Sequence, residues 1–205
     1  MSALFISAFV TFLVVIDPPG CAPIFASVTK GASPQERRAM AFRSVLIAAG
    51  ILIFFGLLGR DLLRALGISL NSFRIAGGLL LFLIAIDMVF EKRTERRENR
   101  AEEVVEDKQE DITVFPMAIP MIAGPGSIAS IMLLMSRSEG WSEYLVVWAA
   151  LGATLALTLL CLLLAGPLMR LIGHKMEAMI TRLLGVILAA LAVQFVIDGI
   201  RRSFF

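Results

Sequence analysis

The 205-residue chain is poor in the residues from which most metal sites and disulfide frameworks are built. It has a single histidine, His174, and two cysteines, Cys21 and Cys161. Both cysteines lie inside apolar segments, and His174 has no second ligand at helical spacing. We therefore expect no disulfide, no metal and no cofactor. No basic cluster resembles a nucleic-acid groove, and the N-terminus lacks the positive region of a cleavable signal peptide.

Charged residues are also scarce, at 18% of the chain, while hydrophobic residues make up 58%. Mean hydropathy is +0.85, whereas soluble domains are about 45–50% apolar even with glycine included. The sequence thus predicts an integral membrane protein whose solvent is the lipid bilayer. A membrane helix needs roughly 20 apolar residues, and six segments qualify: Ala3–Val28, Ala39–Leu58, Phe73–Phe90, Ile112–Met135, Tyr144–Leu164 and Met179–Ile200.

The one long polar stretch, Glu91–Asp111, divides the chain into two halves. We expect residues 1–91 and 112–205 to form the halves of a single transmembrane domain, joined by a solvated, partly helical linker over 92–111. Loops on the linker's side of the membrane carry 13 lysines and arginines, against 6 on the other side. The positive-inside rule places the linker in the cytoplasm and both termini outside.

Two apolar segments are interrupted near their middle. The first contains Ile16-Asp17-Pro18-Pro19-Gly20 and the fourth contains Ala123-Gly124-Pro125-Gly126. Proline removes a backbone donor and clashes with the preceding turn, so an uninterrupted helix is not expected at either place. Freed carbonyls are not tolerated against lipid, so each break should face protein or water. The simpler alternative is that proline and glycine only kink two packed helices.

The halves repeat at a nearly constant offset. Pro19-Gly20 aligns with Pro125-Gly126, and Arg64 and Gly67 align with Arg170 and Gly173, all at an offset of 106 residues. Because each half has three spans, the second half enters the membrane from the opposite side. We therefore predict an all-α membrane protein of six transmembrane helices in two inverted three-helix repeats, with helices 1 and 4 broken at the midplane.

Such an arrangement would bring two half-helix N-termini together, each with free N–H groups and a partial positive charge. That pair suits a carboxylate, to which Ser127 could add a hydroxyl and Cys21 a weaker donor. Pro116 and Pro120 should distort the fourth segment and widen a cavity. The predicted substrate-binding residues are Asp17, Pro18, Pro19, Gly20, Cys21, Gly124, Pro125, Gly126 and Ser127.

Asp17 has no counterpart in the second half, where Ala123 takes its place. A carboxylate within a membrane segment is a functional hypothesis by default. Here it would serve a substrate ammonium, or couple transport to a proton or another cation. Alternatively, Asp17 caps the second half-helix by accepting from the N–H of Gly20 or Cys21. Two further acids lie near the ends of the third and sixth segments, Asp87 and Asp198, and are expected to reach the cytoplasmic and the outer interface.

The stretches from Ile16 to Phe25 and from Ala118 to Ser127 resemble the paired motifs of the MarC family. The resemblance covers essentially the whole chain and implies a bacterial or archaeal inner-membrane protein of the LysE-like transporter superfamily. It also implies similarity to SnatA-type proteins, which move small neutral amino acids such as glycine and alanine with protons. Members commonly have asparagine after the first Pro-x-Gly, where this chain has Cys21.

We therefore predict a secondary transporter of small neutral amino acids, coupled to protons, with its site at the two breaks. The alternative is a channel for a small neutral solute, although apolar residues on both sides of each break favour complete crossings. An enzyme is not expected, because neither Ser127 nor Cys21 has a histidine or lysine base nearby in the sequence. A purely structural membrane protein is the remaining alternative. The sequence leaves the oligomeric state open, including a homo-oligomer.

Overall fold

The structure, a computed structural model, describes residues 1–93, 95, 96 and 112–204, with their side chains except those of residues 169–172, 174, 175 and 177. All regular structure in these residues is helical. In chain order the elements are α1 (Ser2–Ile16), α2 (Pro18–Val28), α3 (Pro34–Ala65), α4 (Leu70–Val89), η1 (Thr113–Ile122), α6 (Pro125–Arg137), α7 (Trp141–Leu163) and α8 (Ala165–Phe204). Most of the predicted linker, 92–111, lies outside the described residues.

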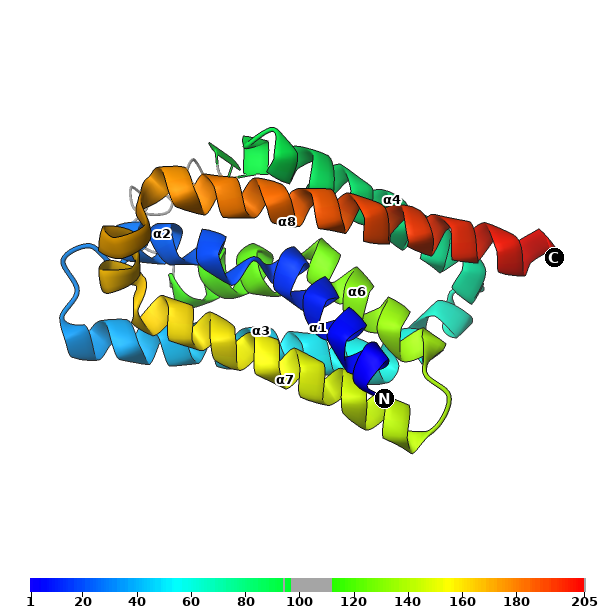
Figure 1. The fold of residues 1–205 in the computed structure, drawn as a ribbon. Helices are drawn as coiled ribbons and strands as arrows, with labels where there is room; N and C mark the ends of the chain where they lie inside the picture. The colour runs from blue at the N-terminus through cyan, green and yellow to red at the C-terminus, as the bar shows by residue number, and fades with distance from the viewer. Residues whose placement is uncertain (94, 97–111, 205) are drawn as a thin grey trace.

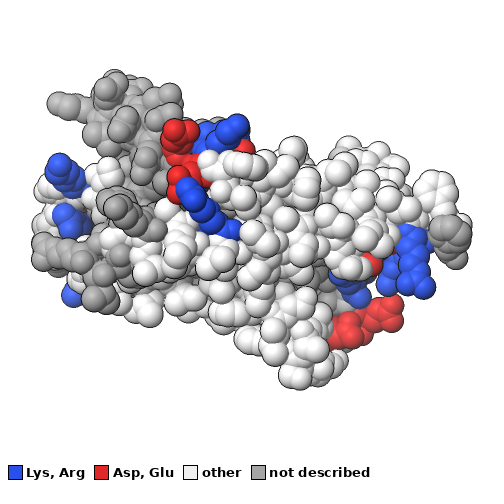
Figure 2. Space-filling view, turned by 45° about the horizontal axis from the view of Figure 1, so that its top comes forward, with Lys and Arg blue, Asp and Glu red and all other residues white. Residues whose placement is uncertain are grey.

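Among the residues that the structure describes, five helical stretches are long and apolar enough to cross a membrane, and η1 with α6 makes a sixth if that bent pair is one span. The α1–α2 pair counts as a single stretch among the five, and α8 contributes its part from Ala178 onward. On the face shown in Figure 2, an uncharged band separates charged side chains toward the two ends of the molecule. This distribution agrees with an apolar belt inside a bilayer.

Several helices extend beyond the apolar segments expected from the sequence. The predicted segment Ala39–Leu58 is too short, because α3 begins at Pro34. The Ser33 hydroxyl accepts from the Glu36 N–H, and the Glu36 carboxylate accepts from the Ser33 N–H. This capping box fixes the helix start ahead of the apolar residues. The predicted sixth segment is likewise longer, with α8 reaching back to Ala165 through a break at Gly173 (φ 71°).

The helices form three layers (Figure 1). The pairs α4/α8 and α3/α7 make the outer layers, and the two interrupted stretches, α1–α2 and η1–α6, lie between them. The α4/α8 contact is the most extensive in the bundle. The middle layer is where buried side chains concentrate, including Phe12, Ile16, Met117 and Ile131. Each interrupted stretch is therefore covered by protein on both sides, as an unpaired backbone requires.

Packing between the halves occurs in matched pairs. The α1 helix packs on α7, and α3 packs on η1 and α6. Similarly, α2 packs on α8, and α4 packs on α6. Gly67 and Gly173, which the predicted repeat aligns, both have left-handed backbone angles, with φ of 68° and 71°. Helices of one half thus pack on helices of the other half.

Arginines from several helices hold the C-terminal end of α6. Arg60 of α3 donates to the Met135 carbonyl at 2.9 Å, and Arg74 of α4 donates to the Ser136 carbonyl at 3.4 Å. Arg137 itself forms an ion pair with Asp198 of α8. Since the last carbonyls of a helix have no partners within it, these contacts satisfy groups that would otherwise be costly to bury.

Candidate functional site

The first interruption centres on Asp17, which has a left-handed backbone (φ 57°, ψ 66°) between α1 and α2. Its carboxylate accepts from the Gly20 N–H at 3.2 Å, so the predicted N-cap of the second half-helix is confirmed. Pro18 and Pro19 occupy the first positions of α2, where no carbonyl of α2 itself needs their missing N–H. A Cβ at position 20 would lie 2.2 Å from Asp17 Oδ2, so glycine is required there.

The Asp17 side chain is almost completely buried, with 1% of its surface exposed. In addition to the Gly20 N–H, its Oδ1 accepts from the hydroxyl of Thr181 on α8, at 3.4 Å. A buried carboxylate is tolerated only when donors satisfy it. The hydrogen bond from Thr181 helps to satisfy this carboxylate and links the first interruption to α8, in an outer layer of the bundle.

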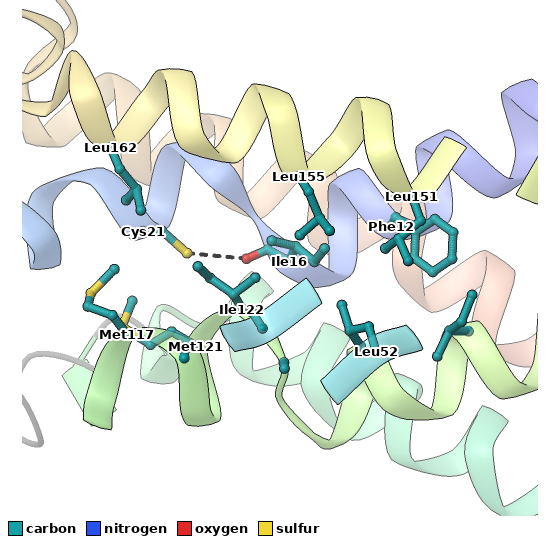
Figure 3. Close-up of a cluster of buried hydrophobic side chains, with 14 of the residues drawn as sticks. Phe12, Ile16, Cys21, Leu52, Met117, Met121, Ile122, Leu151, Leu155 and Leu162 are labelled. Atoms are coloured by element: carbon teal, nitrogen blue, oxygen red, sulfur yellow. Dashed lines mark hydrogen bonds between the residues drawn. The ribbon is translucent and has the colours of Figure 1, made fainter. Parts of the chain in front are cut away.

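Cys21 also serves the first interruption. Its thiol donates to the Ile16 carbonyl at 3.4 Å (Figure 3). In a regular helix that carbonyl would accept from the Gly20 N–H, which here is used by Asp17. Around the thiol lie apolar side chains from η1 and α7, among them Met117, Ile122 and Leu162. Cys21 thus supplies a donor to the backbone inside a tightly packed apolar cluster.

The second interruption has different chemistry. Before it, Phe115 and Ile119 are extended (ψ 126° each), as expected for residues that precede proline. At Pro125 the chain turns by 50° into α6, whose N-cap is Gly124. Among the described residues no side chain caps this helix start. The first N–H groups of α6 are therefore free to receive an anion.

A cavity of about 340 Å³ lies at the start of α6. Its lining comes from α1 just before the first interruption, from α4 and the segment that follows it, from η1, and from the second interruption with the start of α6. The lining residues are Val15, Leu80, Leu83, Ile84, Asp87, Arg93, Arg96, Pro116, Pro120, Met121, Gly124, Pro125, Gly126 and Ser127. The two interruptions approach closely here, because a Cβ at Gly126 would lie 3.0 Å from Val15 Cγ1. Ser127 belongs to the lining, and only 2% of its surface is exposed.

Charged groups enter the cavity from the segment that follows α4. Arg96 forms an ion pair with Asp87. Arg93 donates from Nη2 to the Val15 carbonyl at 2.6 Å, and its Nη1 lies 3.0 Å from Met88 Sδ. One wall of the cavity therefore carries two guanidinium groups and a carboxylate, and another carries the start of a helix. An arrangement of this kind can bind a small molecule that bears charges of both signs.

Comparison with known proteins identifies the group to which the chain is related. A model of the MarC family of integral membrane proteins matches residues 2–204. The chain belongs to the MarC family. It is 37% identical over 197 residues to a UPF0056 membrane protein of Methanocaldococcus jannaschii, covering 96% of each chain. No solved structure matches it.

Two bacterial members of the family are similarly related. The UPF0056 inner membrane protein YhgN of Escherichia coli is 36% identical over 196 residues, which cover 96% of this chain and 95% of YhgN. The UPF0056 membrane protein YvbG of Bacillus subtilis is 32% identical over 205 residues, covering 100% of this chain and 97% of YvbG. The chain is therefore an integral, multi-pass membrane protein, and the predicted family resemblance is confirmed.

The residues predicted to bind substrate in this MarC protein fall into two groups. Gly124, Pro125, Gly126 and Ser127 line the cavity together with the predicted cavity-widening residues Pro116 and Pro120. Asp17, Pro18, Pro19, Gly20 and Cys21 are absent from its lining. The reason is geometric: the side chains of Asp17 and Cys21 are used to satisfy their own interrupted backbone. Whether any of these residues contacts substrate stays a prediction.

Several cavity residues were not singled out from the sequence as substrate contacts, among them Val15, Asp87 and Arg93. Val15 had a detectable signal, because the residue four positions later is Pro19, which cannot donate to its carbonyl. Asp87 was expected only to reach the cytoplasmic interface, yet its carboxylate borders the cavity. Arg93 lies in a charge-rich stretch where nothing local distinguishes it from its neighbours. In the part of the chain that is described, no cluster of three potential metal ligands occurs.

Proposed function

We propose that this MarC protein is a secondary transporter of small neutral amino acids such as glycine and alanine, coupled to protons. One observation carries the proposal: the uncapped start of α6 and the buried hydroxyl of Ser127 border a cavity of about 340 Å³. This volume is at the lower end of the roughly 300–1,000 Å³ typical of ligand pockets. A helix N-terminus and a hydroxyl are a suitable receptor for a carboxylate.

We further propose that the two halves are inverted repeats, with the interruptions near the membrane midplane. The matched contacts between halves support this arrangement, as do the left-handed angles of Gly67 and Gly173. Broken helices in corresponding positions of inverted repeats mark the substrate site in several transporter folds. Rocking of one half against the other would then expose the cavity alternately to the two sides.

Asp17 is proposed as the proton or cation site. Its carboxylate accepts from Gly20 on α2 and from Thr181 on α8, so a change in its charge would be felt by two helices. A buried acid that joins moving parts is suited to coupling, because protonation weakens its attraction for both donors. In this scheme Asp17 lies outside the lining of the substrate cavity. Val15, two residues earlier in the chain, belongs to that lining and so connects Asp17 to the cavity.

The proposed orientation has the linker 92–111 in the cytoplasm and both termini outside, in the inner membrane of a bacterial or archaeal cell. YhgN is named an inner membrane protein, which supports that location. A reporter that is active only outside the cytoplasm should be active when fused after Phe205 and inactive when inserted within 97–111. The opposite pattern would reverse the orientation.

Purified protein in liposomes provides the central test. Labelled glycine, alanine or serine should enter in a saturable manner, faster under an imposed pH gradient, and should exchange with unlabelled amino acid inside. Asp17→Asn should remove the effect of the gradient. Gradient-driven uptake that survives this change would exclude Asp17 from coupling. Uptake without saturation or exchange would favour the alternative, a channel for a small neutral solute.

A further inference from the structure

The main-chain carbonyl of Val15 lacks its usual helical partner. In an α-helix it would accept from the N–H four residues later, but that residue is Pro19, which has none. Val15 lines the cavity and lies on the α1 side of the first interruption. A carbonyl without a donor is costly inside a membrane-spanning segment. The carbonyl is therefore an acceptor in need of a donor, on a residue that lines the cavity.

In the structure, a cationic side chain of the same protein donates a hydrogen bond to this carbonyl. Arg93 follows the end of α4 by four residues, and its Nη2 donates to the Val15 carbonyl at 2.6 Å across a separation of 78 residues. The other end of the guanidinium contacts Met88 Sδ. Neighbouring Arg96 is held by Asp87, so of the two cavity arginines it is Arg93 that reaches the interrupted backbone.

The same cavity contains the features that suit the opposite charge. The uncapped start of α6 and the Ser127 hydroxyl border it, and Gly126 packs close to Val15. An amino acid whose carboxylate lies at the start of α6 would direct its ammonium toward the Val15 side of the cavity. Carbonyls of interrupted transmembrane helices are suited to bind cations. Asp17 is engaged by Gly20 and Thr181 and does not line this space.

We propose that the Val15 carbonyl is the binding site for the ammonium group of the substrate, and that Arg93 is a tethered competitor for this site. The proposal rests on the proposed function and adds to it the residue that controls access. Substrate must displace the guanidinium before its own ammonium can bind. Because only the fraction of molecules with Arg93 displaced can bind, the apparent affinity of the intact protein is reduced by that fraction.

Uptake kinetics of labelled alanine in liposomes test the competition. Arg93→Ala should lower KM by about threefold or more, since the competitor is gone. Arg93→Gln keeps a neutral donor and should give an intermediate KM. Lys92→Ala, which removes the same charge from the adjacent exposed residue, should match the intact protein. In Arg93→Ala, added methylguanidinium should raise KM again without changing the maximal rate. A KM that rises in Arg93→Ala would overturn the proposal and make Arg93 a ligand of the carboxylate.

A binding measurement separates this proposal from the transport proposal. Methylammonium should raise the melting temperature of Arg93→Ala in detergent in a saturable manner, with a much smaller effect on the intact protein and on Lys92→Ala. If this shift is found but no amino acid is transported, the ammonium site stands and the proposed function falls. If transport is found while Arg93→Ala shows neither the shift nor a lower KM, the tethered competitor is excluded and the transporter remains.

Discussion

The hydroxyl of Thr181 donates a hydrogen bond to Asp17 Oδ1 across 3.4 Å and so joins α8 to the interruption between α1 and α2. The same oxygen accepts from the Gly20 N–H. One carboxylate thus fixes the start of a half-helix and attaches it to a helix in another layer. Its structural and proposed coupling roles can be separated, because they depend on different properties of the side chain.

Asp17→Ala should lower the free energy of unfolding by about 1 kcal/mol, the usual cost of losing an N-cap. Asp17→Asn should cost less, because asparagine is also a good N-cap residue while carrying no charge. Unfolding in detergent, followed by circular dichroism, measures both. Thr181→Val serves as the control, since it removes the α8 donor and leaves the cap in place. Equal stability of Asp17→Ala and the intact protein would show that the cap contributes nothing.

Ser127→Ala should weaken substrate binding. If the hydroxyl donates to a carboxylate, its loss removes a hydrogen bond to a charged group worth about 1.5 kcal/mol, or roughly tenfold in KM. Ser130 provides a matched control on the same helix, because its buried hydroxyl has no partner among the described residues. Ser130→Ala should leave KM unchanged and should not destabilise the protein. A similar KM for both variants would remove Ser127 from the site.

Gly126→Ala should impair transport. The added Cβ would lie 2.6 Å from Ile84 Cδ1 and 3.0 Å from Val15 Cγ1, so these side chains must shift into the cavity. We expect a higher KM or a lower maximal rate of uptake. Gly152→Ala on α7 is the control, since its Cβ would meet no atom within 4 Å. That change should preserve transport and stabilise the helix by up to about 1 kcal/mol. Unimpaired transport by Gly126→Ala would mean that the side chains of Ile84 and Val15 can move aside without disturbing the site.

The ion pair between Arg137 and Asp198 should contribute measurably to stability. Both side chains are 30% exposed, and the Arg137 guanidinium also lies 4.3 Å from the centre of the Phe195 ring. A double-mutant cycle with Arg137→Gln and Asp198→Asn should give a coupling energy above about 1 kcal/mol, because a partly buried pair is screened less than a surface pair.

The Arg64–Asp61 pair supplies the comparison, since its side chains are 78% and 69% exposed. Its cycle should give less than about 0.5 kcal/mol, as exposed pairs commonly do. Both cycles use unfolding in detergent at low and high salt. Coupling at Arg137–Asp198 no larger than that of the exposed pair would mean that α6 is held mainly by Arg60 and Arg74.

Much of the helix content could be predicted from the sequence, since it depends on local properties of the chain. A run of about 20 apolar residues has few alternatives to a membrane helix, and six predicted segments correspond to the helical stretches found. The ends were less predictable. Ser33 with Glu36 extends α3 by polar capping, and α8 continues through Gly173 to an earlier start than hydrophobicity indicates.

The position of each interruption was also determined locally, because Pro18, Pro19 and Pro125 carry no N–H to continue a helical ladder. Even the cap formed by Asp17 could be predicted, since its partner is only three residues away. The composition of the cavity could not. Arg93 and Val15 are 78 residues apart, and Thr181 is 164 residues from Asp17. Contacts across such separations follow from how the layers pack, which local patterns do not encode. The sequence alone thus determined where the backbone is left without donors, and only the tertiary structure decided which distant side chains supply them.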